Sequence, residues 1–139
     1  MQVKQAMHSG VYWVDPSTPL CDVAKLMRDH NVGAIPVGDN DRLVGMITDR
    51  DIVCRGLADG LDLDSACARD VMSRGIYFTT ESTSIADAAS IMEEHKVRRL
   101  PVINDKKRMT GMLSVGDISH AGQEQLCGEV LNAAGARAA

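Results

Sequence analysis

The chain contains two copies of one segment. When residues 7–37 are placed on residues 72–102, 12 of the 31 positions are identical without a gap. One extra residue in the following turn shifts the offset, and Asp51-Ile52 then falls on Asp117-Ile118. Ordered matches of this kind indicate a tandem repeat of units about 60 residues long. A unit of that size buries little surface alone, so we expect the two copies to pack on each other.

Both copies show the same order of predicted elements. A short apolar stretch precedes a helix in each copy, at residues 11–14 and 76–78. In the first copy Thr18 is predicted to cap this helix, with Pro19 at the first helical position. In the second copy Thr83 precedes the helix. Apolar residues at helical spacing define one buried face in each copy. They are Leu20, Val23, Ala24 and Met27, and Ile85, Ala88, Ala89 and Met92.

Two strands follow the helix in each copy. Polar turns short enough for antiparallel hairpins join these strands, which are residues 34–37 and 43–47 in the first copy and residues 100–103 and 109–113 in the second. A short helix then begins near Asp49 or Gly116. The order strand, helix, strand, strand, helix predicts an α+β fold in which each unit is a three-stranded mixed sheet with two helices. We expect the two sheets to pack face to face with pseudo-two-fold symmetry.

The predicted boundaries follow from the repeat. Residues 1–60 form the first unit, residues 61–122 the second, and residues 123–139 a Gly/Ala-rich C-terminal tail that is expected to fray. Residues 57–70 link the copies, and residues 61–66 are expected to add a helical turn. Leu126, Val130 and Leu131 are spaced to line one face if the tail forms a helix.

Composition excludes several classes of function. The net charge of −4 argues against a protein whose main task is binding nucleic acid, because such domains are usually basic. No run of 18 apolar residues is present, and the first residues lack the apolar core of a secretion signal, so we expect a cytoplasmic protein without a membrane span. The four cysteines lack metal-ligand spacing and are expected to be reduced thiols, and no metal site is predicted.

The second strand of each hairpin leads into a polar helix start. Thr48 and Ser114 each precede a carboxylate by three residues, Asp51 and Asp117. One interpretation is a helix cap, in which the hydroxyl and the carboxylate bind backbone N–H groups. The other is a nucleotide site, in which the hydroxyl contacts phosphate and the carboxylate accepts hydrogen bonds from both hydroxyls of a ribose. This spacing alone does not decide between the two.

The repeated motifs resemble those of a family. Tandem units with a hydrophobic-Pro-Val strand, a Gly-x-hydrophobic-(Thr/Ser)-x-x-Asp-Ile segment and a helix opening at Ser-Thr look like a CBS domain pair, or Bateman module, over roughly residues 1–120. The short length is similar to that of small stand-alone bacterial pairs of the hypoxic response protein type. The resemblance implies a regulatory protein without enzymatic activity, often a homodimer, that needs no cofactor and binds an adenine nucleotide (AMP, ADP or ATP) between its copies.

The resemblance also implies two sets of ligand-binding residues. The ribose carboxylate, the hydroxyl and the residue that touches the base fall on matching positions of both copies, and the opening strand of the other copy completes each cleft. The set preferred here contains a basic pair suited to phosphate: Asp117, Ser114, Met112, Arg99, Arg98, Gly10, Val11, Tyr12 and Val32. The other set is Asp51, Thr48, Met46, Arg50, Gly75, Ile76, Tyr77 and Val97.

Other interpretations stay open at this point. The chain could be a ligand-free dimeric scaffold that docks an unidentified protein partner, with the Thr/Ser–Asp pairs serving only as caps. It could also be a redox-responsive module that uses Cys54 or Cys67. His30 and His95 are interpreted as cations at helix C-termini, since no nucleophile pairs with them. For Arg98 and Arg99 the alternative to a phosphate contact is an ordinary exposed position.

Overall fold

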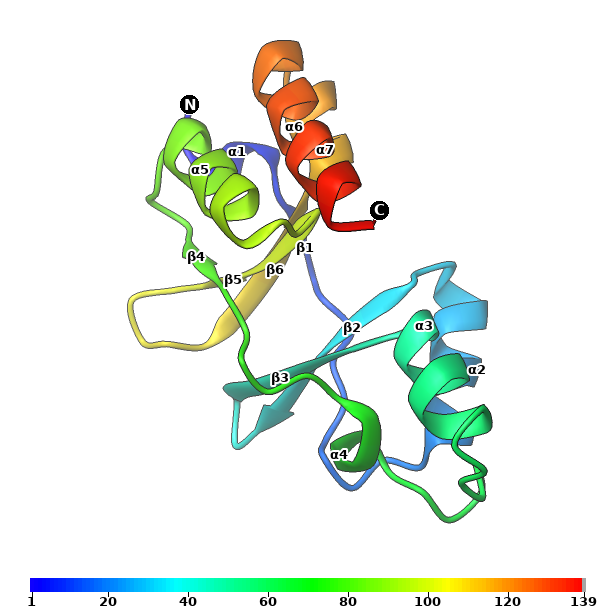
Figure 1. Cartoon of the computed structure of the whole chain (residues 1–139). Helices are drawn as coiled ribbons and strands as arrows, with labels where there is room; N and C mark the ends of the chain where they lie inside the picture. Colours follow the sequence, from blue (N-terminus) through cyan, green and yellow to red (C-terminus); the bar gives the residue numbers. More distant parts are fainter. Residues whose placement is uncertain (139) are drawn as a thin grey trace. The chain divides into compact units, whose positions relative to one another are not determined.

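The computed structural model describes residues 1–138, with side chains through residue 135, and the chain forms two compact units. Unit 2 is the continuous stretch Tyr12–Ile76, whereas unit 1 combines Met1–Val11 with the chain from Tyr77 onward (Figure 1). The compact units therefore start at Tyr12 and Tyr77, five residues after the start of the repeated segment in each copy. The first eleven residues belong to the fold of the second copy.

Unit 2 is built on one hairpin. Its elements are α2 (Leu20–His30), β2 (Ala34–Asp39), β3 (Arg42–Thr48), α3 (Asp49–Asp51), the π-helix η1 (Ile52–Leu57) and α4 (Ala68–Val71). Asn40 and Asp41 both have positive φ and make the tight turn between β2 and β3, as the polar turn predicted. Single-residue bridges add Val14 beside Val37 and Ser73 beside Met46.

Unit 1 has a four-stranded mixed sheet. Its elements are α1 (Val3–Ala6), β1 (His8–Ser9), β4 (Thr79–Thr80), α5 (Ile85–His95), β5 (Arg99–Ile103), β6 (Met109–Ser114), α6 (Val115–His120) and α7 (Glu124–Ala138). The strand order is β1-β6-β5-β4, with β4 parallel to β5 and the other pairs antiparallel. The predicted α+β class is confirmed, and this sheet is mixed as expected. The prediction of three strands in each unit is wrong, because the sheets have four strands in unit 1 and two in unit 2. The fourth strand, β1, comes from the N-terminal segment.

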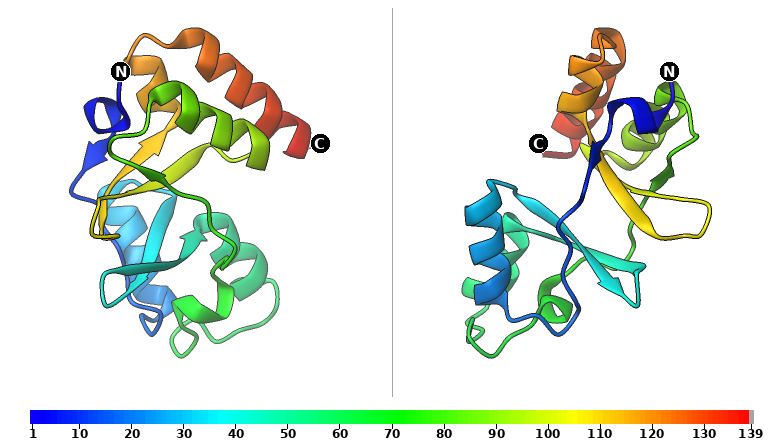
Figure 2. Two further views of the ribbon diagram at one scale, coloured as in Figure 1. Left: turned by 90° about the vertical axis from the view of Figure 1, so that its left-hand side faces the viewer. Right: turned by 180° about the vertical axis from the view of Figure 1, so that it is seen from behind.

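Each unit has its own apolar core. The predicted helix faces are buried, with Leu20, Val23 and Met27 on α2 and Ile85, Ala88, Ala89 and Met92 on α5. Strand residues meet them from the sheet, led by Ile35 and Ile47 in unit 2 and Leu100 and Leu113 in unit 1. Figure 2 shows α5, α6 and α7 on the same face of the unit 1 sheet. The other face of each sheet is thereby left outside its unit's core.

The helix caps differ from the prediction. Pro19 is the N-cap residue of α2, one residue later than the predicted Thr18, and Ser84 is the N-cap residue of α5. The carbonyl of Thr18 accepts a hydrogen bond from the backbone N–H of Ala68 at 2.9 Å, which ties Thr18 to the start of α4. Thr83 instead shares a hydroxyl–hydroxyl hydrogen bond of 2.6 Å with Thr80.

The apolar stretches that were predicted as opening strands are mostly outside the sheets. Of residues 11–14 only Val14 pairs with a strand, and in the second copy β4 begins at Thr79, after residues 76–78. The backbone leaves the sheet before these positions, so the aromatic side chains of Tyr12, Trp13, Tyr77 and Phe78 are exposed.

The predicted frayed tail is instead a helix. The 15 residues of α7 pack against α5 and α6, and Val130 is fully buried. Val130 belongs to the core of unit 1. Among residues 1–138, no helix is both long enough and apolar enough to cross a membrane.

Candidate functional site

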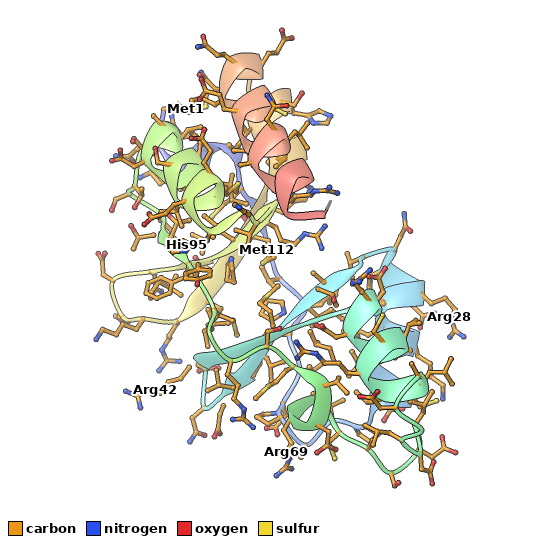
Figure 3. The ribbon with its side chains drawn as sticks, viewed as in Figure 1. Met1, Arg28, Arg42, Arg69, His95 and Met112 are labelled. Atoms are coloured by element: carbon orange, nitrogen blue, oxygen red, sulfur yellow. The ribbon has the colours of Figure 1, made fainter. Side chains whose placement is uncertain are left out.

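Unit 1 gathers polar side chains on the sheet face opposite its helices. On β6, Met112 and Ser114 alternate with the buried Leu113, so they point away from the core. The strand register places His8 of β1 directly across from Met112, and Arg99 of β5 directly across from Ser114. Residues directly opposite each other on paired strands point to the same face. Figure 3 marks the position of Met112 on this sheet.

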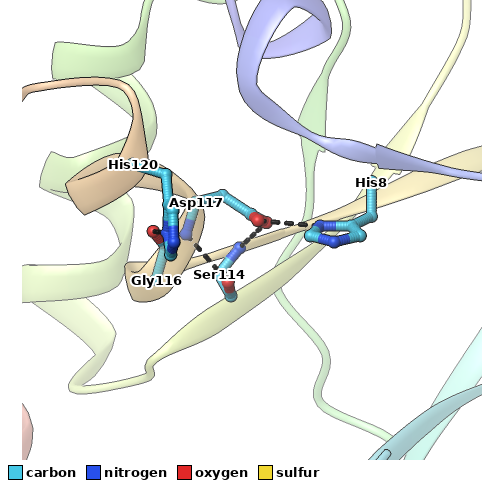
Figure 4. Close-up of polar contacts among 5 residues, drawn as sticks. All are labelled: His8, Ser114, Gly116, Asp117 and His120. Atoms are coloured by element: carbon cyan, nitrogen blue, oxygen red, sulfur yellow. Dashed lines mark hydrogen bonds and ion pairs between the residues drawn. The ribbon is translucent and has the colours of Figure 1, made fainter.

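Asp117 reaches the same region from the start of α6. Its backbone N–H donates to Ser114 Oγ at 3.1 Å, and its Oδ2 accepts from the Ser114 N–H at 2.9 Å (Figure 4). This is the predicted cap, in the reciprocal form of a capping box. The cap uses one carboxylate oxygen and leaves the hydroxyl proton of Ser114 and Oδ1 of Asp117 for other partners. Only 7% of Asp117 is exposed.

His8 takes up the second carboxylate oxygen. Its Nδ1 lies 2.7 Å from Asp117 Oδ1, and its side chain is 81% exposed (Figure 4). A separation this short is typical of a charge-assisted hydrogen bond. The prediction missed His8 because the partners are more than 100 residues apart and His8 has no histidine counterpart in the other copy. We call Met112, Ser114, Asp117, Arg99 and His8 the Asp117 site.

Unit 2 repeats this arrangement with different charges. Asp51 donates its N–H to Thr48 Oγ1 at 3.1 Å and accepts the Thr48 N–H on Oδ2 at 2.9 Å, so the second predicted cap is also present. Ser73 lies across from Met46, where unit 1 has His8, and Ala34 lies across from Thr48, where unit 1 has Arg99. We call Met46, Thr48, Asp51, Ala34 and Ser73 the Asp51 site.

A second acidic side chain stands beside the Asp51 site. Gly33 corresponds to Arg98 of the second copy, and an ideal Cβ at Gly33 lies 3.1 Å from Oδ2 of Asp49. Asp49 itself corresponds to Val115. The region that carries an arginine in unit 1 therefore carries a carboxylate in unit 2.

An aromatic stack occurs in both units and was not predicted. Tyr12 stacks on His30 with ring centroids 3.6 Å apart, and Tyr77 stacks on His95 at 3.5 Å. The histidines do end α2 and α5, as expected, and Figure 3 marks His95 there. The tyrosines cover the rings from the segment before each helix. Identity of both residues across the two copies was the signal that could have paired them.

The predicted ligand residues are divided between the units. Unit 1 holds Asp117, Ser114, Met112, Arg99, Arg98, Gly10 and Val11, while Tyr12 and Val32 belong to unit 2. Unit 2 holds Asp51, Thr48, Met46, Arg50, Gly75 and Ile76, while Tyr77 and Val97 belong to unit 1. Contributions of each unit to the other's site stay predictions.

The cysteines are free thiols, with Cys54 exposed on η1 and Cys67 at the N-cap of α4. Over the described residues 1–138, no group of three or more His, Cys, Asp and Glu side chains is arranged to hold a metal ion. A redox role for Cys54 or Cys67 therefore stays a prediction.

Comparison with known proteins assigns the family. The family model described as "CBS domain" matches twice, over residues 3–55 and 68–124. The chain belongs to the CBS domain family and is a CBS pair, a regulatory module. Both matches begin at the short helices α1 and α4, four residues before the segment in which the repeat was recognised in each copy.

One relative and two solved structures are informative. Hypoxic response protein 1 of Mycobacterium tuberculosis is 44% identical over 117 residues, which are 84% of this chain and 81% of that protein. A crystal structure of Hypoxic Response Protein I with two coordinated zinc ions superposes with a TM-score of 0.79 at 42% identity, covering 86% of this chain and 98% of the other. CBSX2 in complex with AMP, a protein of Arabidopsis thaliana, has a TM-score of 0.76 at 28% identity, with coverage of 88% and 96%.

Proposed function

We propose that this CBS pair is a sensor of adenine nucleotides, with the Asp117 site as its main binding site. The observation that carries the proposal is the shared sheet face on which Met112, Ser114, Asp117 and Arg99 converge. The carboxylate suits the ribose hydroxyls, the hydroxyl of Ser114 is an additional donor, and Met112 is an apolar surface for a purine. The AMP complex of the related CBSX2 supports the same ligand class.

The basic side chains favour a phosphorylated ligand. Arg99 is exposed and lies across from Ser114, and Arg98 precedes it on the same strand end. A guanidinium can donate two parallel hydrogen bonds to a phosphate, which the glycine and alanine of the other copy cannot. A ligand that binds only one conformation of the module shifts its population toward that conformation, and a partner protein then responds to the change.

Calorimetric titration with AMP, ADP and ATP tests the proposal. Asp117→Ala is expected to weaken binding by about 1–3 kcal/mol, the scale for hydrogen bonds to a charged group. Asp105→Ala, which changes an exposed turn residue of the same unit, is the matched control and is expected to bind as the wild type does. Absence of binding of all three nucleotides to folded wild-type protein at millimolar concentration would reject the proposal.

We also propose that the protein is a homodimer in the cytoplasm. Val53 and Leu57 on η1 are more than half exposed, which is unusual for large apolar residues on one short helix. Sedimentation equilibrium measures the mass directly, and a monomer at high micromolar concentration contradicts this part of the proposal.

A further inference from the structure

The two duplicated sites differ mainly in the charge of the side chains around the aspartate. Both have a methionine, a hydroxyl and a capping aspartate in the same register. Around Asp117 the additional side chains are His8, Arg98 and Arg99, and at the corresponding positions around Asp51 the residues are Ser73, Gly33 and Ala34. The Asp51 site also has the carboxylate of Asp49 close by, and Arg50, which lies between Asp49 and Asp51 in the chain, is exposed to solvent.

The aspartate that suits a ribose is unfavourable for a phosphate. The carboxylate that binds the ribose repels a phosphate carried by the same nucleoside. This repulsion is larger when the carboxylate is as buried as that of Asp117. Arg98 and Arg99 offer charge to the phosphate, and neither forms an ion pair with Asp117 in the described part of the chain. His8 lies directly on the carboxylate, with Nδ1 2.7 Å from Oδ1, and is a cation there when it is protonated.

We propose that His8 is a specificity-determining residue, whose protonated imidazole makes the Asp117 site prefer a phosphorylated nucleoside to the bare nucleoside by neutralising Asp117. This inference rests on the proposed function and adds the selectivity of the site. The imidazole leaves Nε2 exposed on the sheet face that carries Arg99, so its charge acts on both the carboxylate and the incoming anion. The Asp51 site has serine at this position and lacks the selectivity.

His8 also lowers the affinity for the ribose, because it competes for Oδ1 of Asp117. A ribose hydroxyl that donates to Oδ1 has to share this atom with Nδ1 of His8. For adenosine this is a cost without compensation, while for AMP the positive charge offsets it. Because AMP and adenosine carry the same ribose, the cost of sharing Oδ1 is common to both and cancels in the ratio of AMP affinity to adenosine affinity. The ratio therefore isolates the effect of the charge and is the quantity to measure.

The experiment measures both affinities by calorimetry in protein that carries Asp51→Ala, so that the Asp117 site dominates. His8→Asn retains an amide donor near the Nδ1 position without the charge, and His8→Lys retains a positive charge without the ring. One unit charge about 4 Å away changes an affinity about fivefold in water-like surroundings. We expect His8→Asn to lower the AMP-to-adenosine ratio about fivefold and His8→Lys to preserve it.

A matched experiment transfers the property to the other copy. Ser73→His, made with Asp117→Ala, is expected to raise the AMP-to-adenosine ratio of the Asp51 site. A role of His8 in merely positioning Asp117 predicts that His8→Asn behaves as the wild type, and that result overturns the inference while AMP binding itself persists. If neither AMP nor adenosine binds to any folded variant, the proposed function fails and the inference fails with it.

Discussion

The two units use one backbone plan for two chemically different surfaces. Hairpin register, proline position, the methionine and the capping box are the same in both. The side chains that flank the box are not, because unit 1 has His8 and Arg99 where unit 2 has Ser73 and Ala34. The residues that hold the strands and the helix start in place are therefore separate from the residues that set the charge of each site.

The largest expected difference between the units is the loss of stability when a side chain is added beside the strand that carries His8. A Cβ at Gly111 would lie 2.5 Å from the backbone oxygen of His8, whereas at Gly45 the first contact, at 2.7 Å, is the flexible end of Met72. We expect Gly111→Ala to lower the free energy of unfolding by about 1–3 kcal/mol, as overpacking does, and Gly45→Ala to lower it less. Urea unfolding measures both values.

This pair of variants also tests how the Asp117 site is assembled. Displacement of β1 in Gly111→Ala moves His8 away from Asp117, so the AMP-to-adenosine ratio is expected to fall as in His8→Asn. Equal stabilities of the two glycine variants would show that β1 and the segment at Ser73 move equally easily to make room for the added methyl group.

A buried hydroxyl gives the next largest effect. Among the described residues, Thr79 is 3% exposed and its Oγ1 has no hydrogen-bond partner, while the corresponding residue of unit 2 is Val14. Replacing an unpaired buried hydroxyl by a methyl group of the same shape removes a desolvation cost, so Thr79→Val is expected to stabilise the protein by about 1 kcal/mol. Thermal unfolding measures the gain as a higher melting temperature.

The neighbouring threonine is the control for that variant. Thr80 has its hydroxyl 2.6 Å from that of Thr83, so Thr80→Val leaves a partner unpaired and is expected to destabilise. A lower melting temperature for Thr79→Val would mean that its hydroxyl has a partner after all.

The smallest effect belongs to α7, which has no counterpart in unit 2. Burial, a hydrogen bond with Glu129 and the charge of Glu129 raise the pKa of Glu93 above its usual value. A carboxyl with a raised pKa in the folded state holds its proton more tightly there, so its contribution to stability is present at low pH and is lost as the pH rises through that raised pKa. We expect Glu129→Gln to stabilise slightly at neutral pH, by at most about 0.5 kcal/mol because Glu129 is exposed.

Stability measured from about pH 4 to pH 8 by urea unfolding checks this expectation. The variant is expected to lose less stability than the wild type as the pH rises. Glu124→Gln removes an exposed charge from the first turn of α7, where it is favourable, and is expected to give no gain. Equal pH dependence in Glu129→Gln and the wild type contradicts the coupling.

Local patterns predicted most of the fold. The Thr48–Asp51 and Ser114–Asp117 boxes and the two hairpins depend on residues a few positions apart, and they were predicted correctly. Helices α1 and α4 were missed because four residues are too few to show a helical period. The cap at Thr18 was placed one residue early, and the contact of its carbonyl with the distant N–H of Ala68 could not be read from a local pattern.

The candidate site was only partly predictable. The methionine, hydroxyl and aspartate follow each other along one strand and helix start, so a motif contains them. The contact between His8 and Asp117 depends on which copy the N-terminal segment joins, and no local pattern carries that information. The same holds for the Tyr12–His30 and Tyr77–His95 stacks, whose partners come from different elements.

The division of the chain has a consequence for its synthesis. All residues of unit 2 are contiguous, so this unit is complete once the ribosome has passed Ile76. The segment Met1–Val11 is made before unit 2 but has to wait for β6 before it finds its partner strand. His8 and Asp117 therefore come together only after the whole of unit 2 has been made, and the Asp117 site is assembled later than the Asp51 site.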